Sequence, residues 1–226
     1  MPNLLITGAG RGLGLEFARQ YAADGWRVHA CARAPGKATA LSALAGEVAL
    51  HRLEVTDAAE LAALKAELAA EPIDLLINNA GISRPPGETI PEIADAAWLQ
   101  VLQVNAIAPL RVATALADNV AASRLKLMVH ITSQLGSIAR ISAGRYPYCM
   151  SKAALNAGAR ALALGLSGRG ITGVLFHPGW VRTDMGGPGA ALDAKASVGA
   201  MRAVIARLKP ADNGRFLNYD GSEIPW

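Results

Sequence analysis

Residues 4–14 read LLITGAGRGLG and decide the fold, because an apolar run leads directly into a cluster of four glycines. An apolar run of this length, Leu4–Thr7, followed by glycine is typical of a β-strand that ends in a tight turn. The next residues, Leu13–Ala23, place apolar side chains three and four positions apart, which predicts a helix. The stretch is therefore a strand–turn–helix unit.

The same alternation continues along the chain. Segments of strand length that are rich in apolar residues occur at Leu4–Thr7, Trp26–Cys31, Val48–Leu53, Ile73–Asn78, Leu125–Thr132, Ile171–His177 and Arg215–Asn218. Helical spacing marks Leu13–Ala23, Ala58–Ala69, Ala96–Ala117, Lys152–Leu166 and Ala196–Leu208. Strands with the composition of IDLLIN need cover on both faces. The sequence thus predicts an α/β Rossmann fold, in which a doubly wound, parallel, seven-stranded sheet forms the middle of three layers.

Composition narrows the class of protein. The 226 residues are 52% hydrophobic and 18% charged, which favours one globular domain over residues 1–226 and excludes a disordered chain. The longest stretch without a charged residue, Ala96–Leu110, is too short and too polar to span a membrane. The N-terminal run has no basic leader, so we expect a cytoplasmic protein. Cys31 and Cys149 lie far apart without metal-ligand spacing, so we expect neither a disulfide nor a bound metal.

The charge pattern argues against nucleic acid. Lys and Arg outnumber Asp and Glu by 22 to 18, but they form no basic stripe, and aromatic residues make up only 5% of the chain. A small anionic ligand needs far fewer cations than a duplex. We therefore expect a small-molecule partner and no nucleic acid.

The glycine turn has the composition of a dinucleotide-binding turn. Glycine lets backbone N–H groups approach a pyrophosphate, and the N-terminus of the following helix adds unpaired donors and a positive dipole end. The alternative is a tight turn without a ligand. If the turn binds a cofactor, the residues in contact are Thr7, Gly8, Gly10, Arg11, Gly12, Leu13 and Gly14.

The end of the second predicted strand favours NADP(H) over NAD(H). Arg33 lies nineteen residues after Gly14, and no Asp or Glu occurs between Gly25 and Gly46. An arginine at this distance pairs with a 2′-phosphate, whereas an acidic residue would hold a free ribose hydroxyl. Arg11 is a second candidate cation for the same phosphate. The alternative is that both arginines only face solvent.

Tyr148 and Lys152 are four positions apart, which places a phenol and an ammonium on one face of a helix. Taken alone, this spacing is typical of an ordinary amphipathic helix. Ser133 adds support, because it follows the strand Leu125–Thr132 at the edge where parallel sheets bind ligands. Asn105 lies in a long predicted helix beside that strand.

At this point the chain resembles the short-chain dehydrogenase/reductase family over essentially its whole length. The resemblance rests on motifs in the family's order: Thr7-Gly8-x-x-x-Gly12-x-Gly14, Asn78-Asn79-Ala80-Gly81, Asn105, Ser133, Tyr148 with Lys152, and Pro178-Gly179-Trp180-Val181-x-Thr183. Residues 131–137 and 219–221 are most similar to C-factor-like and carbonyl-reductase-like members.

The resemblance implies a catalytic role for four residues. Tyr148 would be the acid/base, and the Lys152 ammonium would favour phenolate and shift the phenol pKa toward the working range. Ser133 would hydrogen-bond the carbonyl oxygen. Asn105 would hold a water that relays protons to Lys152.

The resemblance also implies cofactor contacts. Tyr148 and Lys152 would hold the nicotinamide ribose, and the remaining contacts would come from Glu54, Val55, Asn79, Ala80, Gly81, Pro178, Gly179, Val181 and Thr183. The family commonly has Asp at the position of Glu54, so either Glu54 or Asp57 would face the adenine, with Glu54 favoured by register. The roles of Tyr146 and Trp180 stay open. The long Gly136–Tyr146 loop would border the substrate pocket.

The expected activity is a reversible hydride transfer between NADP(H) and a carbonyl or secondary alcohol, without metal. Alanine-rich helices suggest a homo-oligomer, dimer or tetramer, as the family often forms. The alternative function is an NADP-sensing binding or signalling protein with little or no turnover.

Overall fold

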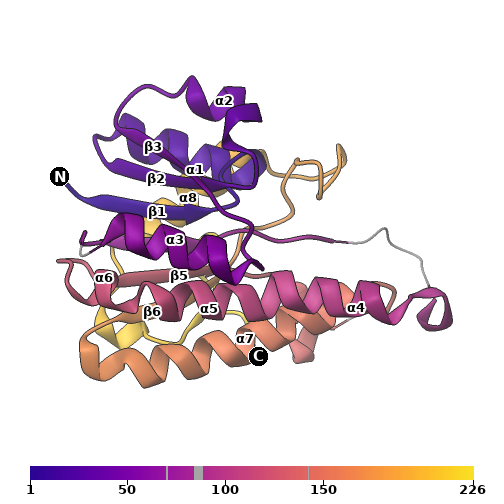
Figure 1. The fold of residues 1–226 in the computed structure, drawn as a ribbon. Helices are drawn as coiled ribbons and strands as arrows, with labels where there is room; N and C mark the ends of the chain where they lie inside the picture. Colours follow the sequence, from indigo (N-terminus) through magenta and orange to yellow (C-terminus); the bar gives the residue numbers. More distant parts are fainter. Residues whose placement is uncertain (70, 84–88, 142) are drawn as a thin grey trace.

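One parallel sheet organises the chain, which a computed structural model describes over residues 1–69, 71–83, 89–141 and 143–226 (Figure 1). Ser142, within the loop expected to border the substrate pocket, lies outside these described residues. Within them, seven strands form the sheet in the order β3-β2-β1-β4-β5-β6-β7. The strands are β1 (Asn3–Thr7), β2 (Arg27–Ala32), β3 (Val48–Arg52), β4 (Leu75–Asn78), β5 (Leu127–Ile131), β6 (Thr172–His177) and β7 (Phe216–Asn218). All neighbouring pairs are parallel, which confirms the predicted Rossmann fold.

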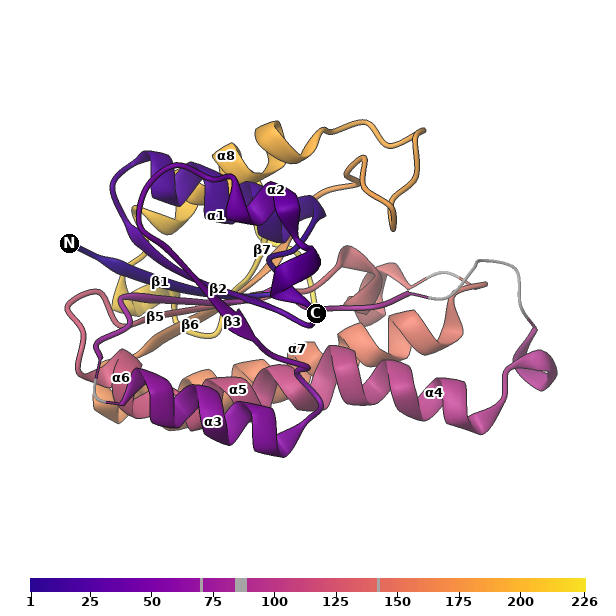
Figure 2. The ribbon, with the colours of Figure 1, turned by 45° about the horizontal axis from the view of Figure 1, so that its top comes forward.

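Helices cover both faces of the sheet (Figure 2). They are α1 (Gly12–Ala23), α2 (Thr39–Ser42), α3 (Ala58–Leu68), α4 (Asp95–Leu102), α5 (Ala108–Ala115), α6 (Ala117–Ala121), α7 (Tyr146–Leu166) and α8 (Ala194–Ile205). In Figure 2, α1, α2 and α8 lie above the sheet, and α3 to α7 lie below it. No helix in the described ranges has the length and apolar character needed to cross a bilayer.

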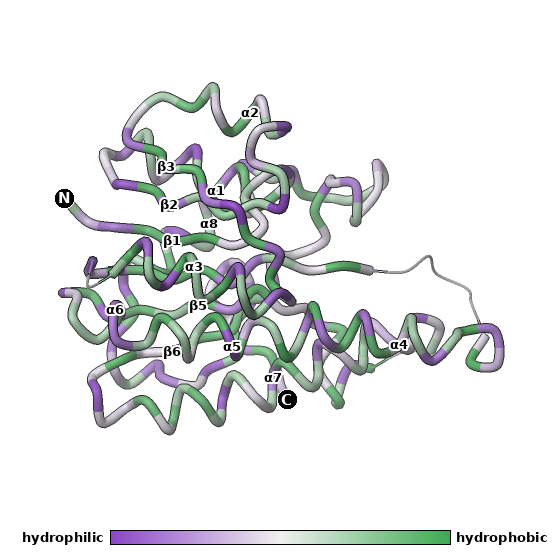
Figure 3. Tube along the Cα trace, in the orientation of Figure 1, coloured by the Kyte–Doolittle hydropathy of each residue, from purple (hydrophilic) through white to green (hydrophobic). Residues whose placement is uncertain are grey.

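The core explains why the strands are apolar on both sides. Leu4 and Ile6 of β1 are fully buried in one cluster with Phe17 of α1, whereas Leu5 is buried in a second cluster with Leu64 of α3. Burying one such side chain contributes about 1.5–3 kcal/mol. The covering helices need only one apolar face, and Figure 3 shows hydrophobic and hydrophilic residues alternating along α5 and α7.

Two elements differ from the predicted ones. The single helix expected over Ala96–Ala117 contains a π-helical turn, η3 (Gln103–Ile107), between α4 and α5, and α6 follows as a separate short helix. Helix α7 begins at Tyr146, earlier than the predicted Lys152, because Pro147 is tolerated in the first turn of a helix. As a result, Tyr148 and Lys152 both belong to α7.

Candidate active site

A cleft of about 620 Å³ lies at the carboxyl ends of the strands, a volume in the usual range of ligand pockets. Predicted site residues that line it are Gly8, Gly10, Arg11, Gly12, Leu13, Arg33, Glu54, Val55, Asn79, Ala80, Gly81, Tyr148, Lys152, Pro178 and Thr183. The other predicted site residues, which lie outside this lining, are Thr7, Gly14, Asn105, Ser133, Gly179 and Val181. One cleft therefore joins the glycine turn to the pair on α7.

The glycine turn is fastened to the end of β4. The Asn79 side-chain amide donates to the carbonyl oxygens of Thr7, at 3.0 Å, and Gly8, at 3.2 Å. In return, the Thr7 hydroxyl oxygen accepts hydrogen bonds from the backbone N–H groups of Asn79 and Ala80, both at 3.1 Å. Thr7 and Asn79 thus hold the turn in place. Of the two residues, only Asn79 also lines the cleft.

Two positions of this turn require glycine because a Cβ atom would not fit there. A Cβ on Gly14 would lie 2.2 Å from the carbonyl oxygen of Gly8, which is far inside contact distance. Gly8 has a φ of +67°, and a Cβ there would lie 2.9 Å from the Cα of Ala80. Gly14 is therefore required by packing between α1 and β1, and Gly8 by both backbone conformation and the approach of β4.

Two cations lie in the loop that follows β2. Arg33 and Lys37 are exposed and line the same cleft, and the Arg33 guanidinium lies 4.0 Å from the Glu54 carboxylate. Lys37 was missed by the sequence reasoning, although it is only one turn beyond Arg33. Arg11 is engaged elsewhere, since its guanidinium lies 2.7 Å from the carboxylate of Asp184. The cationic end of the cleft thus consists of Arg33 and Lys37, with Arg11 paired across the cleft mouth.

Glu54 and Asp57, the two candidates for a contact with the adenine, occupy different positions in the structure. The carboxylate of Asp57 caps the N-terminus of α3 by accepting from the N–H groups of Ala59, at 2.8 Å, and Glu60, at 3.0 Å. Glu54 instead lines the cleft. Of the two acids, only Glu54 lies where a ligand in the cleft would meet it.

Tyr148 and Lys152 line the other end of the cleft, and Ser133 lies next to Tyr148. The Ser133 side chain lies near enough to the Tyr148 phenol to lower its pKa, and the Lys152 Nζ atom lies 5.8 Å from the centroid of the Tyr148 ring. The Lys152 ammonium donates to the carbonyl oxygen of Ile131 at 2.9 Å, which ties α7 to the end of β5. Residues from two distant segments thus present a hydroxyl, a phenol and an amine to one space.

The pKa of Tyr148 differs from the expected direction. Burial raises the pKa of this phenol to about 12, and the hydrogen bond from Ser133 and the charge of Arg145 only partly oppose that rise. The expected lowering of the Tyr148 pKa by Lys152 is a wrong prediction for this structure, because the ammonium is directed at Ile131 and burial dominates. The phenol is consequently protonated at neutral pH.

Burial also acts on the amine. It lowers the pKa of Lys152 to about 8, and it lowers the pKa of the neighbouring His130 to about 4, with the charge of Lys152 as a further cause. Lys152 is therefore charged below about pH 8 and His130 is neutral at neutral pH. Tyr148, Lys152 and His130 thus form one group of neighbouring residues with strongly shifted pKa values, as is common in active sites.

Asn105 lies in the π-helical turn and is completely buried. Its side-chain amide donates to the carbonyl oxygen of Ile82, at 2.8 Å, and to the Ser151 hydroxyl, at 3.0 Å, while its oxygen accepts from the Ile82 N–H at 2.8 Å. Both amide hydrogens are thus used within the protein. The side chain joins the segment after β4 to α7.

The loop after β6 forms the remaining wall. Gly179 has a φ of +82° and packs against Leu192, and Val181 is buried and forms a bridge with the same residue. Thr183 lines the cleft opposite the glycine turn. The Trp180 indole N–H donates to the carbonyl oxygen of Gly186 at 2.8 Å, so this ring anchors the loop.

Several lining residues carry no sequence signal that would have marked them. They are Gln100, Gln103 and Val104 on the α4–η3 segment, and Met185 after Thr183. Tyr146, the other phenol near the lysine, begins α7 and does not line the cleft. The structure thus agrees with the spacing, in which Tyr148 has Lys152 at the i+4 position and Tyr146 has Met150.

The chain belongs to the short chain dehydrogenase family, whose sequence model matches residues 2–191. It is 44% identical over 156 residues to C-signal of Myxococcus xanthus, which covers 69% of this chain and 93% of that protein. Carbonyl reductase Sniffer of D. melanogaster is 31% identical and superposes with a TM-score of 0.92 over 100% of both chains. The NADPH-bound carbonyl reductase from chicken fatty liver is 33% identical, with a TM-score of 0.91 over 100% of this chain and 94% of that one. These similarities confirm the prediction of a carbonyl-reductase-like member of the family.

Proposed function

We propose that the protein is an NADPH-dependent oxidoreductase that reversibly transfers hydride between the cofactor and a carbonyl or secondary alcohol, with Tyr148 as acid/base. The observation that carries the proposal is that Tyr148 and Lys152 line the same cleft as the glycine turn, with Ser133 next to the Tyr148 phenol. A protein that only senses the cofactor has no need for this arrangement.

The cleft fits a dinucleotide. Gly8, Gly10 and Gly12 line the cleft at the start of α1, where backbone N–H groups and the helix N-terminus would meet a pyrophosphate. Arg33 and Lys37 supply charge-assisted hydrogen bonds for a 2′-phosphate, and Glu54 lies on the adenine side of the same region.

The remaining cofactor contacts follow from the wall positions. Asn79, Ala80 and Gly81 would border the adenosine ribose, and Pro178 with Thr183 would lie along the nicotinamide. Gly179 and Val181 would shape the loop that carries them, and Thr7 would hold Asn79 in place.

The catalytic residues have complementary tasks. When bound, the cofactor supplies the hydride, and the carbonyl oxygen of the substrate gains negative charge. The protonated phenol of Tyr148 donates its proton to that oxygen, and the Ser133 hydroxyl stabilises the charge as it develops. The Lys152 ammonium then favours the phenolate that remains. In the reverse direction the same groups remove the alcohol proton.

Asn105 supports this arrangement from behind. Because its side chain bonds Ile82 and Ser151, we assign it the task of holding the Lys152 region of α7 next to the segment after β4. Both of its amide hydrogens are committed, so a water relay at this position would use backbone groups of the π-helical turn.

A matched pair of tyrosine variants tests the proposal. The wild type is expected to oxidise NADPH in the presence of aldehydes or ketones, and Tyr148→Phe to lower kcat by roughly 10² to 10⁴-fold with the Kd for NADPH unchanged. Tyr146→Phe removes a phenol that has Met150 at the i+4 position instead of a lysine, so it retains wild-type kcat within about threefold. Tight NADPH binding without turnover of any carbonyl compound would instead favour the sensor.

A further inference from the structure

The chain turns back on itself after β7. The backbone N–H of Gly221, whose φ is +90°, donates to the carbonyl oxygen of Asn218 at 2.9 Å. The Asp220 carboxylate accepts from the backbone N–H of Ser222 at 2.9 Å and fixes the turn. The returning segment then pairs with the strand, since the Ile224 N–H donates to the carbonyl oxygen of Phe216 at 2.9 Å. The segment therefore has a defined path along the sheet edge.

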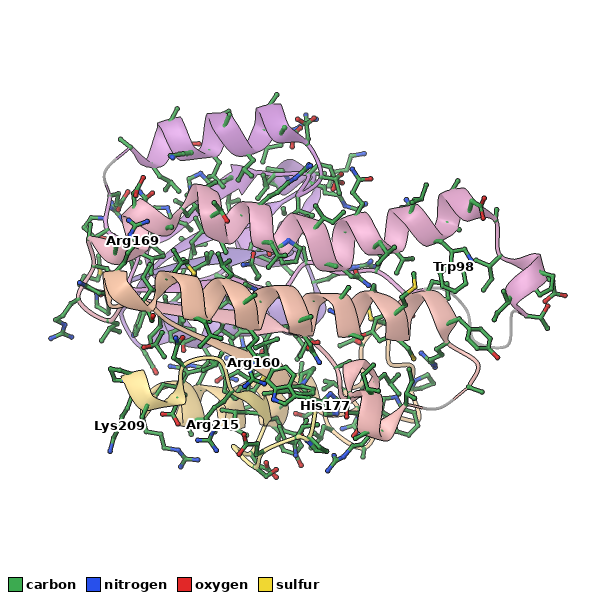
Figure 4. The ribbon with its side chains drawn as sticks, turned by 90° about the horizontal axis from the view of Figure 1, so that it is seen from below. Trp98, Arg160, Arg169, His177, Lys209 and Arg215 are labelled. Carbon is green, nitrogen blue, oxygen red and sulfur yellow. The ribbon has the colours of Figure 1, made fainter. Side chains whose placement is uncertain are left out.

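This segment packs against the helix that carries Tyr148 and Lys152. Ile224 is buried in a cluster with Leu155 of α7 and Phe216 of β7. The ring of Trp226 lies 5.4 Å from that of Phe216, and the Arg160 guanidinium of α7 lies 4.7 Å from the Trp226 ring. Figure 4 shows Arg160 directed from α7 toward the C-terminal part of the chain.

Two hydrogen bonds connect the same segment to the loop that follows Ser133. The hydroxyl of Ser137, which is completely buried, donates to the carbonyl oxygen of Pro225 at 2.6 Å. The backbone N–H of Ala139 donates to the carbonyl oxygen of Trp226 at 3.1 Å. We call residues 224–226 the tail latch and residues 137–141 the substrate loop.

A separate anchor holds the first part of the connection. The Asn156 amide of α7 donates to the carbonyl oxygen of Gly136 at 3.2 Å, and a Cβ on Gly136 would lie 2.7 Å from the backbone carbon of Lys152. The residues next to Ser133 are thus packed directly on α7. The hydrogen bonds of the tail latch to Ser137 and Ala139 lie beyond this anchor, within the substrate loop.

We propose that the tail latch positions the substrate loop and thereby sets how tightly the carbonyl substrate binds, an inference that rests on the proposed function. Residues 134–141 follow Ser133 directly, so we infer that this segment borders a substrate held between Ser133 and Tyr148. Its early part is fixed by Asn156, whereas its middle is fixed by Pro225 and Trp226. Trp226 is consequently a positioning residue for substrate and has no contact with the cleft that would hold the cofactor.

A pair of tryptophan variants tests this role. Trp226→Ala is expected to raise KM for carbonyl substrates roughly tenfold, with kcat changed less than about threefold and the Kd for NADPH unchanged, because uniform substrate binding is lost. Ser137→Ala, which removes one of the two bonds, is expected to change KM in the same direction, and Trp226→Phe to restore a near wild-type value. Trp26→Ala is the control, since Trp26 is also half-buried beside one aromatic ring, that of Tyr21 at 4.7 Å. It is expected to lower the melting temperature without changing KM.

Hydrogen exchange gives a readout that does not depend on activity. In Trp226→Ala, the amide of Ala139 is expected to exchange faster than in the wild type, whereas amides of β2 are unaffected. The proposal would be overturned if Trp226→Ala changed neither KM nor the exchange of the Ala139 amide. An equal rise of KM in Trp26→Ala would also overturn it. If the wild type reduced no carbonyl compound, the proposed function would be wrong. The exchange rate of the Ala139 amide would then show by itself whether the tail latch holds the substrate loop in place.

Discussion

The two ends of the cleft are built on different principles. At the glycine turn, a steric constraint is added to the hydrogen bonds between Thr7 and Asn79, since Gly8 and Gly14 are pressed against backbone atoms of neighbouring elements. At the substrate end, the constraints are hydrogen bonds between segments far apart in the sequence, such as Ser137 to Pro225, which are 88 positions apart. At Gly8 and Gly14 the first end has no room for an added atom, whereas the second end depends on the continued presence of particular partners.

This difference explains why the glycine-turn end of the cleft can be recognised in the sequence and the hydrogen bonds of the substrate end cannot. A steric requirement for glycine is written into a short local pattern, because only one residue type satisfies it. A long-range hydrogen bond can be made by many residue types, so Ser137 and Trp226 have no local signature. Substitutions at the two ends should accordingly fail in different ways.

The largest effect is expected from Gly14→Ala. Its Cβ would lie 2.2 Å from the Gly8 carbonyl oxygen, so the free energy of unfolding should fall by about 3 kcal/mol and NADPH binding should weaken with it. In the same turn, a Cβ added to Gly10 would have the Cβ of Ala32 as its nearest neighbour, at 3.7 Å. Gly10→Ala should therefore change the free energy of unfolding by less than about 0.5 kcal/mol. Urea titrations check both values, and equal losses would show that the steric account is wrong.

A smaller effect is expected at the cationic end of the cleft. Arg33→Ala and Lys37→Ala should each weaken NADPH binding by about 10- to 100-fold, because a charged hydrogen bond to phosphate is lost, and NADH binding much less. Arg52→Ala serves as the control, since this neighbouring guanidinium pairs with Glu60 and is outside the cleft lining.

Fluorescence titration with both cofactors gives the ratio of the two Kd values for each cationic variant. Arg52→Ala should leave that ratio unchanged. A fall of equal size for NADPH and NADH in Arg33→Ala would remove the basis for NADP(H) preference.

The smallest effect is a pH dependence that sharpens the role of Lys152. Burial lowers the pKa of Lys152 to about 8, so its ammonium is present below this pH and is lost above it. The kcat/KM for carbonyl reduction should then fall above about pH 8, by up to about tenfold per pH unit, while Tyr148 stays protonated. In Lys152→Arg the cation persists, so the residual activity should lack this decline. The same decline in both proteins would assign the titration to another group.

The sequence predicts the fold well because apolar strands and helical spacing recur throughout the chain. It does not predict the π-helical turn at Asn105, whose geometry depends on hydrogen bonds to Ile82 and Ser151. The short helix α2 is also missed, because its four residues are too few for a periodic pattern. These differences arise where tertiary contacts, not local propensity, determine the backbone.

In the candidate site, too, the sequence predicts what local motifs determine and misses what tertiary contacts determine. Gly8, Gly10 and Gly12 of the glycine turn line one cleft together with Tyr148 and Lys152, and Ser133 lies next to Tyr148. Burial is the part that a sequence does not state, so the direction of the Tyr148 pKa was wrong. Lys37 lies four residues beyond Arg33, past the strand end where a contact to the 2′-phosphate is expected, so no local pattern marks it.

Transfer of label from NADPH tests the central claim most directly. NADPH that carries deuterium at the hydride position is incubated with a carbonyl compound, and the alcohol is analysed by mass spectrometry. The wild type is expected to place one deuterium on the former carbonyl carbon, and Tyr148→Phe to do so roughly 10² to 10⁴ times more slowly. Alcohol without label, or label transfer at the wild-type rate in Tyr148→Phe, would contradict direct hydride transfer assisted by this phenol.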